Sequence, residues 1–101
     1  MQQRGYVEHL MEEIVSATAR IADLTGEGKL ADAERELDAA WTSTLGFRRA
    51  DAARLDEGTL RVLLGAKATC AAKLLAAESA IEEARGNTAA AKTLRDRASK
   101  L

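Results

Sequence analysis

Three polar side chains near the N-terminus have the types and spacing of metal ligands. His9, Glu12 and Glu13 lie at positions i, i+3 and i+4, so a helix would place them on one face. An imidazole and two carboxylates can bind a divalent metal. The same spacing is common among solvated residues that pair locally on a helix. We favour this second interpretation, which predicts no metal site and no cofactor. His9 is the only histidine, so it has no second imidazole with which to form an acid–base pair.

The single cysteine, Cys70, is the one thiol of the chain. A reactive thiol usually lies beside a cation or at a helix N-terminus, whereas Cys70 lies within an apolar, alanine-rich segment. We therefore predict a buried or half-buried small hydrophobic residue. Gly26 and Gly28 end a predicted helix instead of following a strand, so they do not predict a phosphate-binding loop. These patterns together favour a protein that is not an enzyme.

The composition favours a cytoplasmic protein. A lone cysteine cannot form an intrachain disulfide, which fits a reducing compartment. The first residues are polar, and no apolar run reaches the length of a membrane-spanning helix, so we expect neither a signal peptide nor a membrane segment. The net charge of −1 provides no overall basic field for nucleic acid.

Positive charge is concentrated in the last 17 residues, where five basic residues accompany one acidic residue. Lys92 and Arg95 of this segment, with Lys73, are candidate basic contacts for an acidic partner or RNA. No aromatic residue accompanies them for base stacking. We therefore favour the interpretation that the C-terminal cations complement a helix dipole, and nucleic-acid binding is the weakest of the functions considered.

The elements that must position these residues are helical. Proline is absent, alanine is abundant, and 101 residues suffice for one domain. Apolar residues at steps of three and four predict helices over about 6–25, 29–45, 57–64, 66–85 and 88–100. Residues 46–55 are predicted to be a connector or an irregular helical turn. Alanine buries little area, so the core is thin and self-association is expected.

Glycines and a capping residue define the predicted helix ends. Gly28 supplies the left-handed conformation after the first helix. Asp56 is a good N-cap, with Leu55 and Leu60 placed for a hydrophobic staple. Gly65 predicts a break. Because the loops are short, consecutive helices should be antiparallel. The predicted fold is all-α, with antiparallel hairpins at about 6–45 and 66–100 and a connector with a short inserted helix at about 46–64, in one domain spanning 1–101.

The first hairpin resembles a tetratricopeptide repeat. In that pattern a glycine opens the turn, and large or small residues follow at two, five, nine and twelve positions further on. The matching residues are Gly28, Leu30, Ala33, Leu37 and Ala40. The small residues allow close approach of paired helices, and the large ones fill the gaps. A weaker copy contains Gly86, Ala91 and Ala98, but the two glycines are 58 residues apart, whereas a regular array repeats at about 34.

The whole chain also resembles a short bacterial family of tetratricopeptide-repeat-like proteins without an assigned function. The shared motifs, in order, are Arg4-Gly5-Tyr6-Val7, the Gly28–Ala33 turn, Leu45-Gly46 and Leu55-Asp56-Glu57. The resemblance implies the fold and, by analogy, repeat-mediated binding of another protein. On this register the inner helix positions are Val15, Thr18, Ala22, Lys73, Ala76 and Ala80. Among them only Lys73 is basic and none is asparagine, so the sequence does not predict a carboxylate clamp.

The three aromatic residues are the candidate interface anchors. Tryptophan and tyrosine are favoured at interfaces, although Tyr6, Trp41 and Phe47 are more simply explained as core residues. The predicted function is noncatalytic binding of a protein partner, or self-association into a homo-oligomer. The alternative is a small-ligand or metal-binding helical domain that uses the face containing His9, Glu12 and Glu13.

Overall fold

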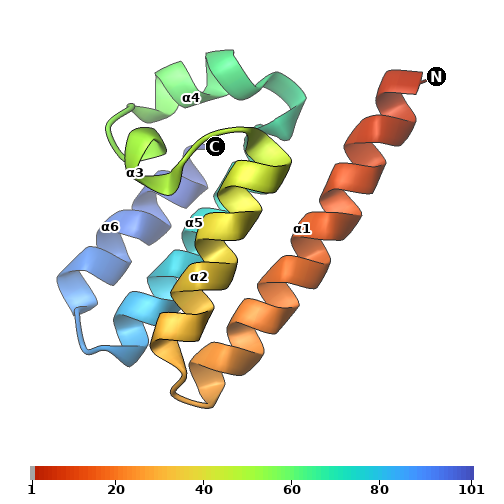
Figure 1. Ribbon diagram of the computed structural model, residues 1–101. Coiled ribbons are helices and arrows are strands. Elements are labelled where there is room, and N and C mark those ends of the chain that lie inside the picture. The colour runs from red at the N-terminus through yellow and green to blue at the C-terminus, as the bar shows by residue number, and fades with distance from the viewer. Residues whose placement is uncertain (1) are drawn as a thin grey trace.

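The computed structural model describes residues 2–101, with side chains from residue 5 onward, and this part of the chain is helical without strands (Figure 1). The elements are α1 (Gln2–Gly26), α2 (Leu30–Ala40), the π-helical turn η1 (Trp41–Leu45), α3 (Arg49–Ala52), α4 (Glu57–Leu64), the 3-10 turn η2 (Gly65–Lys67), α5 (Ala68–Ala84) and α6 (Thr88–Ser99). The predicted all-α class is confirmed. The five predicted helices correspond to α1, α2 with η1, α4, α5 and α6, and α3 is one further turn within the predicted connector.

Two antiparallel helix pairs are closed by the same glycine motif. After α1, Lys29 N donates to Leu24 O at 2.9 Å and Gly28 N to Thr25 O at 3.1 Å. Gly28 has φ 78°, the left-handed conformation that this helix end requires. The turn between α5 and α6 repeats the pattern around Gly86, at φ 85°. Each turn reverses the chain within a few residues, so α2 packs along α1 and α6 packs along α5.

Helix α5 lies at the centre of the molecule. It packs against α1, α2 and α6, and α4 contacts the beginning of α5 (Figure 1). In Figure 1 α1 and α5 run in the same direction, from the end of the molecule that contains α4 toward the two glycine turns. The first helices of the two pairs therefore lie side by side and parallel.

The predicted apolar stripes form the core. The first stripe buries Leu10, Ile14, Ala17 and Ile21. The small residues expected at helix contacts are also buried, and they include Ala33, Ala40, Ala71 and Ala91. Cys70 is fully buried within this core, as expected, and burial raises the pKa of its thiol. No helix in the described part of the chain has the length and apolar character needed to cross a membrane.

The N-terminus of α4 is capped as predicted. The Asp56 side chain accepts a hydrogen bond from Thr59 N at 2.7 Å, and this bond lowers the pKa of the Asp56 carboxyl. Leu60 is fully buried and Leu55 packs partly buried against the same core, as the staple requires. The predicted second helix differs, because its α-helical part ends at Ala40 and its last turn widens into η1.

Candidate functional site

A hollow of about 370 Å³ lies between the parallel helices α1 and α5. We call it the α1–α5 groove and define it by its lining, which consists of Val15, Thr18, Ile21, Ala22, Thr25, Lys73, Ala76, Ala77 and Ala80. These residues recur at steps of three and four on each helix, so the hollow follows one face of α1 and one face of α5. Its volume falls within the range typical of ligand pockets.

Small side chains create the groove. Four of the nine lining residues are alanines, and Ile21 below them is 1% exposed and belongs to the core. Three of the alanines, Ala76, Ala77 and Ala80, lie on α5 and fill little of the space between α5 and α1. Val15 at the rim is 52% exposed, so its apolar side chain borders the groove at the protein surface. The groove therefore presents an apolar surface to solvent.

The two threonines add little donor capacity to this surface. Thr18 Oγ1 donates to Ile14 O at 2.9 Å, and Thr25 Oγ1 donates to Ile21 O at 2.7 Å, both within α1. Each hydroxyl proton is thereby used inside its own helix. The lone pairs of the hydroxyl oxygens remain able to accept a hydrogen bond from a ligand.

Lys73 is the only charged residue of the groove lining. Its side chain is exposed, and no ion pair to it is found among the side chains of residues 5–101. By contrast, Arg20 on the other side of α1 pairs with Glu36 at 3.0 Å. An ammonium group without a carboxylate beside an apolar hollow can attract an anionic group of a ligand.

The structure brings together all six inner positions named from the sequence. Val15, Thr18, Ala22, Lys73, Ala76 and Ala80 all line the α1–α5 groove. The sequence located these positions and did not predict a carboxylate clamp there, because only Lys73 is basic and none is asparagine. The signal that was missed is the run of small residues at Ala76, Ala77 and Ala80.

The predicted aromatic anchors do not form one exposed surface. Trp41 is 1% exposed and belongs to the core, which was the simpler explanation favoured from the sequence. Its Nε1 is buried without a hydrogen-bond partner in the described part of the chain. Phe47 packs partly buried against the same core. Tyr6, near the start of α1, is 56% exposed, so it alone of the three presents most of its side chain to solvent.

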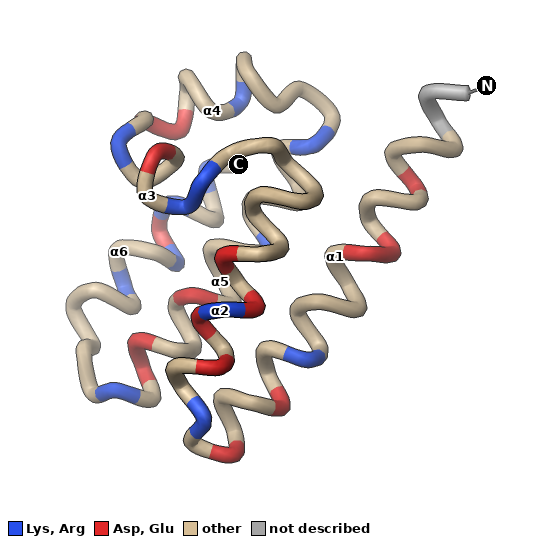
Figure 2. The backbone as a smooth tube through the Cα atoms, in the orientation of Figure 1, with Lys and Arg blue, Asp and Glu red and all other residues tan. Residues whose placement is uncertain are grey.

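The basic side of α6 is largely neutralised by ion pairs. Lys92 Nζ lies 3.0 Å from Asp96 Oδ2, and Arg95 Nη1 lies 3.1 Å from Glu83 Oε2. Arg97 Nε contacts Glu57 Oε2 at 2.7 Å. Figure 2 shows acidic residues among the basic ones in this region. Lys92 and Arg95 thus each have a carboxylate partner, whereas none is found for Lys73 among residues 5–101.

The side chains of His9 and Glu13, on the predicted metal-binding face, are exposed and only loosely paired. His9 Nε2 lies 4.0 Å from Glu13 Oε2, and the two side chains are 69% and 50% exposed. No group of three or more histidine, cysteine, aspartate or glutamate side chains is placed to hold a metal ion in the described part of the chain. The metal-binding alternative therefore has no preformed site in this region.

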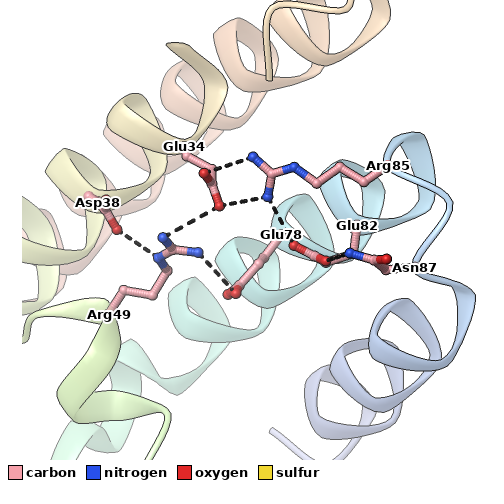
Figure 3. A network of polar contacts seen from close by, with 7 residues as sticks. All are labelled: Glu34, Asp38, Arg49, Glu78, Glu82, Arg85 and Asn87. Carbon is pink, nitrogen blue, oxygen red and sulfur yellow. Dashed lines mark hydrogen bonds and ion pairs between the residues drawn. The ribbon is translucent and has the colours of Figure 1, made fainter. Parts of the chain in front are cut away.

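A second polar cluster, which sequence reasoning missed, fastens the connector to the helices (Figure 3). Arg49 of α3 contacts Asp38 at 2.6 Å and Glu78 at 3.0 Å, so it joins α2 to α5. Arg85 contacts Glu34 at 2.8 Å. We call the set the Arg49 network; its members are Glu34, Asp38, Arg49, Glu78, Glu82, Arg85 and Asn87. The partners of Arg49 are distant in sequence, so no local pattern reveals them.

The carboxylates of the Arg49 network have different environments. A hydrogen bond from Arg85 lowers the pKa of Glu34 below its ordinary value, and the charges of Arg85 and Arg49 add to this effect. Burial raises the pKa of Glu78, against the charge of Arg49. The network thus includes one carboxylate whose ionised form is favoured and one whose ionised form is disfavoured by its surroundings.

Comparison with known proteins assigns no family. No family model, no curated protein and no solved structure matches the chain. The chemistry of the α1–α5 groove is therefore the basis for a functional proposal.

Proposed function

We propose that the chain is a noncatalytic, tetratricopeptide-repeat-like protein that binds a segment of a partner protein in the α1–α5 groove. The observation that carries the proposal is the apolar hollow of about 370 Å³ beside Lys73, for which the described side chains provide no carboxylate partner. The lining residues offer hydroxyl, ammonium and aliphatic groups, with both hydroxyl protons already donated to backbone carbonyls. Such a lining suits recognition of a surface better than bond-making chemistry.

The repeat-like part of the proposal is supported by how the helices pair. Each pair closes at a glycine with a left-handed backbone, Gly28 or Gly86. The small residues of the repeat pattern, Ala33 and Ala91, are fully buried where the paired helices meet. Parallel first helices then form one continuous surface, as stacked hairpins do.

The chemistry of the groove defines the partner segment. Its alanines leave room for a large apolar side chain such as leucine or phenylalanine, whose burial contributes about 1.5–3 kcal/mol. Lys73 favours an acidic residue on the same segment, and an exposed ion pair of this kind contributes about 0–1 kcal/mol. The expected ligand is thus a short segment with a bulky apolar residue near an aspartate or glutamate, with modest affinity.

Selection from a displayed random-peptide library tests this proposal. We expect enriched peptides to share a bulky apolar residue near an acidic one. Replacing Ala76 with leucine should fill the hollow and weaken binding about 10–100-fold. Lys73→Glu should weaken binding about fivefold.

Two variants of α6 provide matched controls. Ala90→Leu adds the same side chain at an exposed alanine, and Lys92→Glu reverses a lysine that is already paired with Asp96. Both should retain binding. Enriched peptides without acidic residues would contradict the proposal. Peptides that bind the Ala76→Leu variant with the same affinity as the parent chain would also contradict it.

A further inference from the structure

The three-residue 3-10 turn η2, which begins at Gly65, separates α4 from α5. Gly65 N donates to Arg61 O in the last turn of α4, and Gly65 O accepts from Ala68 N in the first turn leading to α5. Leu64 and Ala68 have right-handed helical torsions. Gly65 has φ 57° and ψ −124°, which no helix contains. The chain direction therefore changes at one pair of backbone torsions.

The conformation of Gly65 is accessible to glycine but not to an L-residue without strain. Its mirror image, near φ −57° and ψ 124°, resembles the ordinary extended conformation of an L-residue. A Cβ atom added at Gly65 would meet nothing within 4 Å. Strain from a substitution would thus come from the torsions alone, since there is space for the side chain.

If residue 65 became helical, α4 and α5 would form one helix from Glu57 to Ala84, about 42 Å long. The segment before Gly65 would then leave α5 and α6, which separates the Glu34–Arg85 and Glu57–Arg97 ion pairs. Helices α1 and α2 would also move away from α5, and their packing contacts with it would be lost. Every one of these contacts can form again between the same residues of two copies.

We infer that Gly65 is the hinge of a domain exchange, and that the partner is a second copy of this chain. Residues 2–64 of each copy pack on α5 and α6 of the other, and the hinge helices lie beside each other at the two-fold axis. Val62 and Leu63, one turn before the hinge, are 82% and 55% exposed in the closed chain. The exchanged dimer covers this apolar pair. Glycine at the hinge favours the closed monomer, because it alone adopts the bent torsions freely.

The variant Gly65→Ala tests the inference. Alanine disfavours the bent torsions and favours the helical ones, so the ratio of helical to bent conformations should rise about tenfold or more at each hinge. Two hinges per dimer should lower the dissociation constant about 100-fold, measured by light scattering over a concentration series after refolding. Gly46→Ala is the matched control: it has φ 77° and free space at Cβ, but the extended Arg48 prevents a continuous helix there. That variant should stay as monomeric as the parent chain.

A D-alanine at position 65, introduced by chemical ligation at Cys70, provides the opposite change. The bent torsions are ordinary for a D-residue, so this variant should be monomeric and at least as stable as the parent chain. A Gly65→Ala chain that folds and remains monomeric at all concentrations would overturn the inference. If Gly65→Ala fails to fold, a D-alanine variant that forms more dimer than the parent chain at the same concentration would do the same.

Charge reversal distinguishes exchange from surface association. In the Gly65→Ala background, Glu34→Arg on one chain and Arg85→Glu on another leave mismatched pairs in each homodimer. Only an exchanged heterodimer restores an opposite-charge pair at both positions, because residue 34 of each copy meets residue 85 of the other. Native mass spectrometry after co-refolding should show the heterodimer above its statistical share. A statistical distribution would contradict the exchange.

Discussion

The α1–α5 groove and the Arg49 network lie on either side of α5 and are built from opposite materials. The groove is lined mainly by small or apolar residues, and its one cation, Lys73, pairs with no carboxylate among the side chains of residues 5–101. The network places Arg49 within 4 Å of three carboxylates from two other helices. One face of α5 thus borders a hollow with a single cation, and the opposite face contributes a carboxylate to a network of ion pairs. The groove is the surface that we propose for partner binding, whereas the network connects elements of the fold.

Adding the same side chain in a packed helix contact and in the groove tests whether the groove is open space. Ala33 is fully buried where α2 meets its neighbours. Ala33→Leu should lower the free energy of unfolding by about 3 kcal/mol, because the helices must move apart. Ala76→Leu should change it by less than about 0.5 kcal/mol, because Ala76 opens onto the hollow. Urea denaturation measures both, and equal losses would show that the groove is a packed contact.

Removal of Arg49 tests the network side of the comparison. Arg49→Ala leaves Glu78 half-buried beside α3 with no cation, and it releases α3 from α2. We expect a loss of about 2 kcal/mol, less than for a fully buried pair because the side chains of Arg49 and Glu78 are 24% and 18% exposed. Arg48→Ala is the control, since its pair with Asp51 is mainly exposed, and it should cost less than about 0.5 kcal/mol. Similar losses for both variants would remove the special role of Arg49.

The pH dependence of stability should distinguish two carboxylates of the Arg49 network, Glu34 and Glu78. The lowered pKa of Glu34 means that the unfolded chain binds more protons, so its contribution is present above pH 4.5 and is lost as the pH falls through the folded pKa. The raised pKa of Glu78 means that the folded chain binds more protons, so its contribution falls as the pH rises from 4.5 through the folded pKa.

The two matched variants should therefore change the pH profile in opposite directions. Glu34→Gln should reduce the loss of stability that occurs as the pH falls below 4.5. Glu78→Gln should reduce the loss of stability that occurs as the pH rises above 4.5. Chemical denaturation at a series of pH values measures both slopes, and slopes of the same sign would show that the assignment of the two environments is wrong.

Local patterns predicted the helices and much of the core. The stripe with Leu10, Ile14 and Ile21 follows from the helical period, and the Asp56 cap follows from its position before Leu60. Both are properties of residues that are neighbours on one helix. The all-α class was predictable for the same reason.

Features that depend on several elements could not be predicted. Arg49 meets carboxylates 11 to 29 residues away in sequence, and no period relates them. The hollow of the α1–α5 groove arises from two helices that are far apart in the chain, so alanine spacing alone does not tell a tight contact from an open one. Gly65 was recognised as a break, but its torsions, which make it a one-residue hinge, depend on how α4 packs.

Chemical-shift mapping by NMR, with a peptide from the library selection, tests the central claim most directly. We expect titration to shift the backbone amides of Val15, Thr18, Lys73, Ala76 and Ala80 more than any on α6. We also expect Lys73→Glu to reduce these shifts at equal peptide concentration. Saturable shifts confined to α6 or the Arg49 network, with the amides of the groove unchanged, would contradict the account.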